Sequence, residues 1–364
     1  MAGLIGVDAS RAIRPIQTGT ERYSRALIQT LLARPGERRY RLYFDRPPQG
    51  CFGDAPNAEQ RVIRMPRGWT HLGLGTEIAR RPPDLLFVPS HVLPVVCRVP
   101  SVATIHDVGY LWHREAYSPL AWLLLHLGTL RNTRADRIIA DSEATTRDLI
   151  ANFRVDPARV RVAYLGGPTE QSIGDPTAAR QVYKLPARYF LFVGTLQPRK
   201  NLRRLLQAFA RIAPRYPDVG LALAGQAGHG APALVAEVAR LGLSERVQLL
   251  GYVPPADLPS LFAAAVGFVF PSLYEGFGMP ALEAMVWGTP VIASKASSLP
   301  EVVGDAGLLV DPYDVASLAD ALARLLEDPA LRQELIAAGR SRAGLFTWDR
   351  CSEGVEAVFD ELTG

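Results

Sequence analysis

The chain has little cysteine and little lysine, and it contains no long run of apolar residues. Its three cysteines, Cys51, Cys97 and Cys351, are odd in number and show no C-x-x-C or mixed Cys/His spacing, which excludes the usual disulfide frameworks and zinc sites. The amino terminus shows no basic region followed by a cleavage site, so no signal peptide is expected. These features together predict a cytoplasmic protein.

The most apolar stretch, residues 120–130, contains His126 and is too short to span a bilayer. We expect a buried helix there. The alternative is a face that rests on a membrane, with Trp112 and Trp122 as interfacial anchors. Such a contact would make the protein peripheral at the cytoplasmic membrane face.

Lysine is replaced by arginine almost throughout, and the charge is unevenly divided. Residues 1–170 carry 23 Arg against 16 acidic residues, a net of +7, whereas residues 171–364 carry 17 basic and 20 acidic residues, a net of −3. A basic half can attract an anionic partner such as a polyprenyl phosphate or an acidic membrane surface. No nucleic-acid motif accompanies it, and the arginines are scattered, so a solvated face is the alternative.

Short apolar runs alternate with helical patterns along the whole chain, which predicts parallel sheets in doubly wound α/β domains. The expected strands lie near residues 4–7, 40–44, 85–88, 101–105 and 137–140 in the first half, and near 189–193, 220–224, 247–250, 266–270 and 291–293 in the second. At 364 residues the chain is long enough for two such domains. The turn-rich segment 166–176 is the expected linker between them. Ligands bind at the carboxyl ends of strands in sheets of this kind, so motifs that follow a strand are the candidates for a site in the cleft between the domains.

The stretch from Phe270 to Val291 carries the most specific pattern, FPSLYEGFGMPALEAMVWGTPV. It reads as strand, loop, helix and strand, and it sets Glu275 and Glu283 around a glycine-containing turn, with seven residues between them. Glu275 is expected on the loop and Glu283 in the first helical turn. Carboxylates there suit sugar hydroxyls, whereas the alternative makes them a solvated loop residue and a helix-dipole partner.

The turn itself is expected to bind phosphate. Pro280 lies near the first helical position, where its missing N–H costs nothing. The amides of Phe277, Gly278 and Met279 would therefore converge on the space ahead of the helix, which favours an anion.

This block resembles the E-x7-E signature of the retaining glycosyltransferases of family four, and the likeness extends over nearly the whole chain. The resemblance implies the GT-B fold, two Rossmann-like domains facing across a cleft with a final helix that crosses back to the first domain. The implied boundaries are 1–168 for the acceptor domain, 169–346 for the nucleotide-sugar domain and 347–364 for the returning helix. It further implies that Glu275 lies beside the transferred sugar and that Glu283 holds the nucleotide ribose.

A second motif, GTLQPRKN at residues 194–201, follows an apolar strand and places two cations at a helix start. Because a helix N-terminus disfavours positive charge, Arg199 and Lys200 indicate an anion that neutralises them. The resemblance assigns Lys200 to the donor diphosphate. Many relatives have Arg where this chain has Thr195, so Arg199 is expected to supply part of the missing charge. Two plain surface residues are the alternative.

Two weaker signals lie in the first half. Gly19 follows the first strand and opens an amphipathic helix; the resemblance implies backbone contact with the donor phosphates, and an ordinary N-cap turn is the alternative. His106 ends the strand 101–105, and the resemblance gives it a hydrogen bond to the donor sugar. A structural His bonded to Asp107 is its alternative.

No D-x-D motif occurs, and Asp141-Ser142-Glu143 is interpreted as a helix start, with Ser142 and Glu143 at the N-cap and first turn. We therefore expect no metal and no cofactor, and charge stabilisation by Lys200, Arg199 and backbone amides. The resemblance implies metal-independent transfer of a hexose, with retention, to a glycan or lipid-linked acceptor. GDP-mannose is the first-choice donor and a UDP-sugar the second choice. A nucleotide-sugar epimerase and a silent nucleotide-binding module stay open as alternatives.

Overall fold

The computed structural model describes all residues except 1–2, 16–17, 54, 170–171 and 229, so two residues of the expected linker lie outside the described residues. The chain divides into two compact units. Unit 1 comprises Met1–Leu111, Tyr117–Gly166 and Thr347–Gly364; unit 2 comprises Trp112–Ala116 and Gly167–Phe346. The short segment Trp112–Ala116 therefore clusters with unit 2, although it lies within the first 168 residues.

The described residues of unit 1 form a seven-stranded parallel sheet in the order β3-β2-β1-β4-β5-β6-β7. The strands are β1 Leu4–Asp8, β2 Arg39–Phe44, β3 Ala58–Val62, β4 Leu85–Val88, β5 Ser101–Ile105, β6 Arg137–Ala140 and β7 Val160–Val162. The helices are α1 Gly19–Ala33, η1 Trp69–Leu74, α2 Gly75–Arg80, η2 Gly109–Leu111, α3 Pro119–Asn132, α4 Glu143–Phe153, η4 Pro157–Arg159 and α13 Trp348–Thr363.

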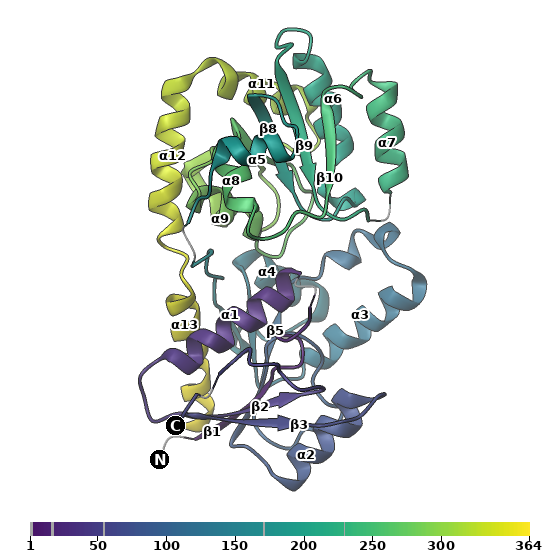
Figure 1. The fold of residues 1–364 in the computed structure, drawn as a ribbon. Helices are drawn as coiled ribbons and strands as arrows, with labels where there is room; N and C mark the ends of the chain where they lie inside the picture. Colours follow the sequence, from purple (N-terminus) through teal and green to yellow (C-terminus); the bar gives the residue numbers. More distant parts are fainter. Residues whose placement is uncertain (1–2, 16–17, 54, 170–171, 229) are drawn as a thin grey trace. The chain divides into compact units, whose positions relative to one another are not determined.

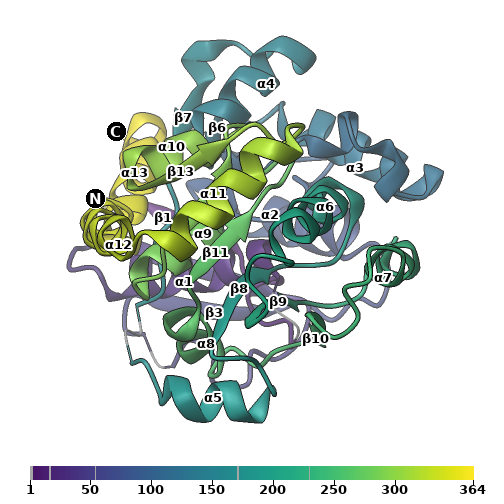
Figure 2. The ribbon, with the colours of Figure 1, turned by 90° about the horizontal axis from the view of Figure 1, so that it is seen from above.

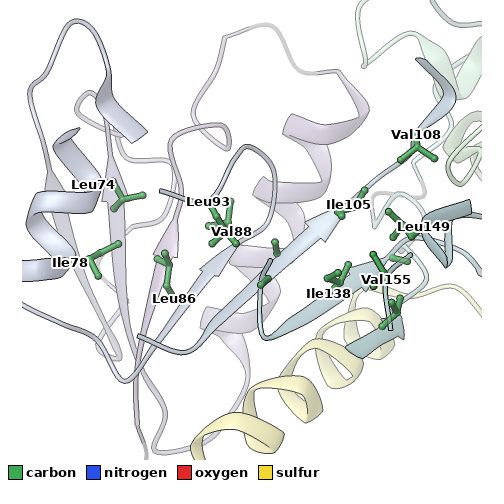
Figure 3. Close-up of a cluster of buried hydrophobic side chains, with 14 of the residues drawn as sticks. Leu74, Ile78, Leu86, Val88, Leu93, Ile105, Val108, Ile138, Leu149 and Val155 are labelled. Carbon is green, nitrogen blue, oxygen red and sulfur yellow. The ribbon is translucent and has the colours of Figure 1, made fainter. Parts of the chain in front are cut away.

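The core of unit 1 follows from the two-residue period of its strands. Leu86 and Val88 of β4 point to the same face as Ile138 of β6, and they meet Leu149 of α4 in one buried cluster (Figure 3). Ile78 of α2 lies in the same cluster. Burial on both faces explains why the central strands are continuous apolar runs.

The last helix, α13, belongs to unit 1 and packs against α1 (Figure 1). Phe359 contacts the ring of Phe87 with centroids 5.2 Å apart. On its polar side Glu356 accepts from the Arg34 guanidinium at 2.7 Å, and Glu361 accepts from Arg137 at 2.6 Å. The chain thus leaves unit 1 after Gly166 and returns to it at Thr347.

Helix α3 differs from the sequence expectation. Its leucines are exposed, Leu120 to 66% and Leu124 to 60%, so the buried-helix prediction is wrong. Trp122, proposed above as an interfacial anchor, instead packs against the core cluster and donates its indole N–H to the Tyr110 carbonyl at 3.0 Å. Among the residues that the structure describes, no helix has both the length and the apolar character needed to cross a bilayer.

The described residues of unit 2 form a six-stranded parallel sheet in the order β10-β9-β8-β11-β12-β13. The strands are β8 Arg188–Val193, β9 Val219–Ala224, β10 Val247–Gly251, β11 Gly267–Phe270, β12 Val291–Ser294 and β13 Gly307–Val310. The helices are η3 Arg114–Ala116, α5 Pro176–Val182, η5 Pro198–Lys200, α6 Leu202–Ile212, α7 Ala231–Arg240, α8 Leu258–Ala264, α9 Met279–Val286, α10 Leu299–Val303, η6 Gly304–Ala306, α11 Val315–Glu327 and α12 Pro329–Ala343.

The helices of unit 2 form separate packing groups around this sheet (Figure 2). α6 packs against α7 and α11, α9 packs against α12 and α10, and α5 packs against α8. Both units are therefore doubly wound Rossmann-like α/β folds, which confirms the predicted fold class.

Candidate functional site

The centre of the unit 2 sheet is a topological switch point. β8 lies between β9 and β11, so the chain leaves β8 toward one edge of the sheet and later returns beside it on the other side. A crevice at the carboxyl ends of such a strand pair is where doubly wound sheets bind ligands. The loop after β8 carries Arg199 and Lys200, and the loop after β11 carries Glu275.

The loop after β8 is fixed by close backbone packing. Gly194 donates its N–H to the Ala224 carbonyl at 2.9 Å, and Leu196 donates to Gln226 at 3.0 Å. A Cβ on Gly225 would lie 1.9 Å from the Gly194 carbonyl oxygen, and Gly225 has a φ of +148°. Only glycine fits this contact. Thr195 is exposed on this loop.

Asn201 joins the loop after β8 to two other loops. It lies just after η5, with a left-handed φ of 60°, and its buried side-chain amide donates to the Pro271 carbonyl at 3.0 Å and to the Pro312 carbonyl at 2.7 Å. The backbone N–H of Leu273 also donates to the Arg199 carbonyl at 2.8 Å. The loops after β8 and β11 therefore form one hydrogen-bonded assembly.

Arg199, Lys200 and Glu275 meet in this assembly. Lys200 Nζ lies 2.5 Å from Glu275 Oε1, and Arg199 Nη1 lies 3.1 Å from Glu275 Oε2. Arg199 also donates to the Tyr274 carbonyl at 2.8 Å, and Lys200 Nζ lies 4.7 Å from the centroid of the Phe270 ring. Two cations face one carboxylate, so this cluster keeps one formal positive charge.

Glu275 is buried, with 7% of its surface exposed. Burial acts to raise the pKa of its carboxyl, but the charges of Lys200 and then Arg199 outweigh it and lower the pKa from 4.5 to about 2. The carboxylate is therefore ionised throughout the physiological range and can accept hydrogen bonds from hydroxyl groups.

Two serines after β12 hold the loop that follows Glu275. Ser297 Oγ accepts from the Glu275 N–H at 2.8 Å, and Ser298 Oγ donates to the Phe277 carbonyl at 2.8 Å. Gly278 adopts a φ of +106°, and a Cβ there would lie 2.6 Å from Leu299 Cδ2. The turn that opens α9 is thus restricted to glycine by both conformation and space.

The residues of the E-x7-E block occupy this one turn and helix. Phe277 and Gly278 lead into α9, which begins at Met279. Glu283 is the fifth residue of α9, one position beyond the first turn in which it was expected. Its side chain is buried, with 1% exposed.

The unit 1 residues are placed at the carboxyl ends of β1 and β5. Gly19 is the first residue of α1, after the N-cap Thr18, whose backbone N–H donates to the Glu21 carboxylate at 3.1 Å. Among the described residues nothing lies within 4 Å of a Cβ built on Gly19, so packing does not demand glycine there. This geometry fits both backbone approach to a ligand and an ordinary capped helix start.

His106 uses both ring nitrogens within unit 1. Nδ1 lies 2.8 Å from Asp141 Oδ2, and Nε2 lies 3.0 Å from the Pro89 carbonyl oxygen. Burial acts to lower the His106 pKa, but the Asp141 charge raises it above the usual value. The structural alternative paired His106 with its neighbour Asp107, but the hydrogen-bonded carboxylate is that of Asp141. Ser142 caps α4 as predicted, accepting from the Thr145 N–H at 3.1 Å.

Sequence reasoning missed the supporting residues Asp141, Ser297 and Ser298, because a single Asp or Ser carries no pattern before its neighbours in space are known. It named Trp112 as an interfacial anchor but not its contact with Tyr274, on which it stacks with ring centroids 5.2 Å apart. Within the described part of the chain, no three His, Cys, Asp or Glu side chains gather as metal ligands.

Comparison with known families matches both parts of the chain. Residues 177–342 match the family model described as "Glycosyl transferases group 1", and residues 18–171 match "Glycosyltransferase Family 4". The O-antigen chain mannosyltransferase B of Escherichia coli is 37% identical over 262 residues, which cover 69% of this chain and 68% of that protein. The D-inositol 3-phosphate glycosyltransferase of Salinispora arenicola is 35% identical over 246 residues, which cover 62% of this chain and only 55% of that protein.

Solved structures share the fold over almost the full length. A sucrose-phosphate synthase from Thermosynechococcus elongatus superimposes with a TM-score of 0.76 at 23% identity, over 99% of both chains. Anabaena HepE, solved in complex with UDP and glucose, gives a TM-score of 0.76 at 22% identity, over 99% of this chain and 100% of that one. These likenesses show the GT-B fold.

Proposed function

The chain belongs to the group 1 glycosyltransferases, and within this family we propose that it transfers a hexose from a nucleotide diphospho-sugar to a hydroxyl of a glycan or lipid-linked acceptor, with retention at the anomeric carbon. The observation that carries this proposal is the cluster of Arg199, Lys200 and Glu275 at the switch point of unit 2.

Negative charge grows on the diphosphate as the bond to the sugar breaks. The cluster's formal charge of +1, together with the amides of Phe277, Gly278 and Met279, is suited to stabilise that charge. On donor binding, Lys200 would divide its contacts between Glu275 and the diphosphate. Because Arg199 also contacts Glu275, the carboxylate keeps a partner during this exchange.

Glu275 and Glu283 are assigned to the sugar hydroxyls of the donor, Glu275 beside the transferred hexose and Glu283 at the ribose. A carboxylate held ionised by two cations is a strong hydrogen-bond acceptor. Gly19 of unit 1 is assigned to the donor phosphates, and Thr195 to the same part of the donor. His106 is better suited to position its strand end than to bind the sugar, because both its nitrogens already face acceptors.

Retention by double displacement requires a carboxylate on the opposite face of the sugar. We propose instead that the acceptor attacks the anomeric carbon from the same face of the sugar that the phosphate leaves. The bond from the anomeric carbon to the phosphate oxygen breaks, the acceptor oxygen forms its bond to the same carbon, and the acceptor proton moves to the departing phosphate.

GDP-mannose is the first donor to test, because the relative with 37% identity is named a mannosyltransferase. A UDP-sugar is the second, since a protein of the same fold was solved with UDP and glucose. Thermal shift and donor hydrolysis would be measured for GDP- and UDP-sugars, in buffer with a chelator. Activity that survives chelation supports the metal-independent step, and an absolute requirement for Mn²⁺ contradicts it.

Three variants test the site. Lys200→Met keeps volume but removes the charge, and Glu283→Gln keeps shape but removes the negative charge and one of the two acceptor oxygens; each should weaken donor binding on the order of tenfold or more. Lys184→Met, an exposed lysine in a turn between α5 and β8, is the matched control. Donor binding unchanged in both site variants would show that the assignment is wrong. Conversion of the free nucleotide sugar into an epimeric nucleotide sugar, without an acceptor and without hydrolysis, would favour the epimerase alternative, and binding without any conversion would favour the silent module.

A further inference from the structure

Helix α3 of unit 1 exposes a continuous leucine face. Six leucines of α3 are exposed to between 40% and 66%, and five of them, each three or four residues from another, lie on one side of the helix. We call this the leucine face: Leu120, Leu123, Leu124, Leu127 and Leu130. On the opposite side Thr129 and Asn132 are buried, with 8% and 6% exposed, whereas Leu125 is exposed to 41%. The helix is apolar along most of its length and turns its broader leucine side outward.

Specific bonds hold α3 in this orientation. Asn132 accepts from the Leu93 N–H at 2.9 Å and donates to the His91 carbonyl at 2.7 Å. A Cβ on Gly128 would lie 3.0 Å from Val92 Cγ2, so the inner side is also closely packed. A rotation of α3 that turned the leucines inward would break these bonds. The leucine face is therefore held on the outside of unit 1.

The neighbouring segment extends the apolar surface. The Arg131 guanidinium donates to the Pro94 carbonyl at 3.0 Å, which ties residues 94–96 to the last turn of α3. Val95 and Val96 follow directly and are exposed to 63% and 55%. An apolar patch of this extent on a single unit indicates an interaction surface.

The two segments that carry this patch contain basic but no acidic residues. Residues 91–100 and 117–135 contain no Asp or Glu, and they contain Arg98, Arg131 and Arg134. Arg98 and Arg134 are exposed. Two copies of the chain paired face to face through this patch would bring like charges together, which disfavours a dimer. An anionic lipid surface complements both the leucines and the arginines.

We propose that the leucine face of α3, with Val95 and Val96, lies in the interface of an anionic phospholipid bilayer, with Arg98 and Arg134 at the lipid phosphates. α3 has 14 residues, fewer than the roughly 20 that a spanning helix needs, so it would lie along the surface. This surface serves a lipid-linked acceptor if the proposed function holds, but the docking itself needs neither donor nor acceptor.

The test is co-sedimentation of the full chain with vesicles, without nucleotide sugar. Phosphatidylcholine vesicles containing phosphatidylglycerol should bind the protein, and pure phosphatidylcholine vesicles should bind it on the order of tenfold more weakly. Leu124→Gln with Leu127→Gln should weaken binding by about tenfold, because both side chains leave the apolar layer. Gln is a good helix former, and both sites are exposed, so folding is preserved.

The matched control is Val182→Gln with Val235→Gln, two exposed apolar residues of α5 and α7 in unit 2. It should bind vesicles like the parent. Arg98→Gln with Arg134→Gln should weaken binding to the anionic vesicles and reduce its dependence on salt. Unchanged circular dichroism in each variant would show that weaker vesicle binding does not come from unfolding. An unchanged donor-induced thermal shift would show that it does not come from damage to the proposed donor site.

Two results would overturn the proposal. One is a parent protein that binds neither vesicle type, or a leucine variant that binds as well as the parent. The other is a parent dimer that becomes monomeric in the leucine variant with no change in vesicle binding, which would assign the face to a second copy of the chain.

Discussion

The ion pair of Lys200 and Glu275 makes a quantitative prediction about the stability of the unit 2 sheet. The Glu275 pKa falls from 4.5 to about 2 in the folded chain. A depression of this size corresponds to roughly 3 kcal/mol of folding free energy. Because the folded pKa is the lower one, this contribution is fully present above about pH 4.5 and is lost as the pH falls toward 2.

Lys200→Met removes the nearest cation and leaves Glu275 with Arg199 at 3.1 Å. Breaking a buried pair costs about 3–5 kcal/mol, and the remaining partner should reduce this to about 2–3 kcal/mol. Glu275→Gln removes the carboxylate. In the double variant neither Lys200 nor Glu275 is left buried without the other, so its cost should fall short of the sum of the single variants by about 1–2 kcal/mol.

Hydrogen–deuterium exchange of β8 and β11 peptides measures the free energy of opening this sheet itself. It would be followed between pH 3 and pH 7 in the parent and the three variants. The parent should lose stability below pH 4.5, and Glu275→Gln should lose less over the same range. Additive effects within about 0.5 kcal/mol, or the same pH dependence with and without the carboxylate, would refute the coupling of these two side chains.

Three further predictions concern the supports of the two units. Gly225→Ala should destabilise the loop after β8 by more than about 2 kcal/mol, because its Cβ would collide with the Gly194 carbonyl; urea denaturation checks this, and a change below about 0.5 kcal/mol would contradict it. Asn201→Asp loses both amide donors and should cost about 3 kcal/mol in the same measurement, whereas a neutral result would mean that these bonds are not formed. Asp141→Asn should lower the melting temperature most at pH values below 6.5. The raised His106 pKa means that the pair contributes stability below pH 6.5 and loses it as the pH rises through the folded His106 pKa. Burial also raises the Asp141 pKa, so the contribution falls again once that carboxyl is protonated at more acidic pH. A deficit that is constant from pH 5 to pH 9 would argue against the ion pair.

The sequence pattern predicts every strand that lies inside a sheet, and one edge strand, β10. Interior strands such as β4 and β5 are buried on both faces and read as apolar runs. The pattern missed β3, β7 and β13, which all lie at sheet edges. β3, with the sequence AEQRV, has no buried residue, β7 has only three residues, and only the last residue of β13 is buried, so none of them reads as a buried apolar run.

The sequence could also place Glu275, Lys200 and Gly278 on loops after strands, because the motifs are contiguous. It could not show that Lys200 and Glu275 pair, since 75 residues separate them and only the sheet order brings β8 beside β11. It could not show the partner of His106 either, because Asp141 follows a different strand.

By itself, the sequence determined the α/β class, the two-fold repetition of the architecture and the family, because local periodicity and short motifs encode them. The tertiary structure alone decided which charges meet and which faces are covered. Helix α3 shows this most clearly: its leucine content predicts burial, but the polar bonds of Asn132 and the packing of Gly128 fix the other side against the loop after β4. Orientation of a nearly uniformly apolar helix depends on such contacts, and they are specified by residues distant in the chain.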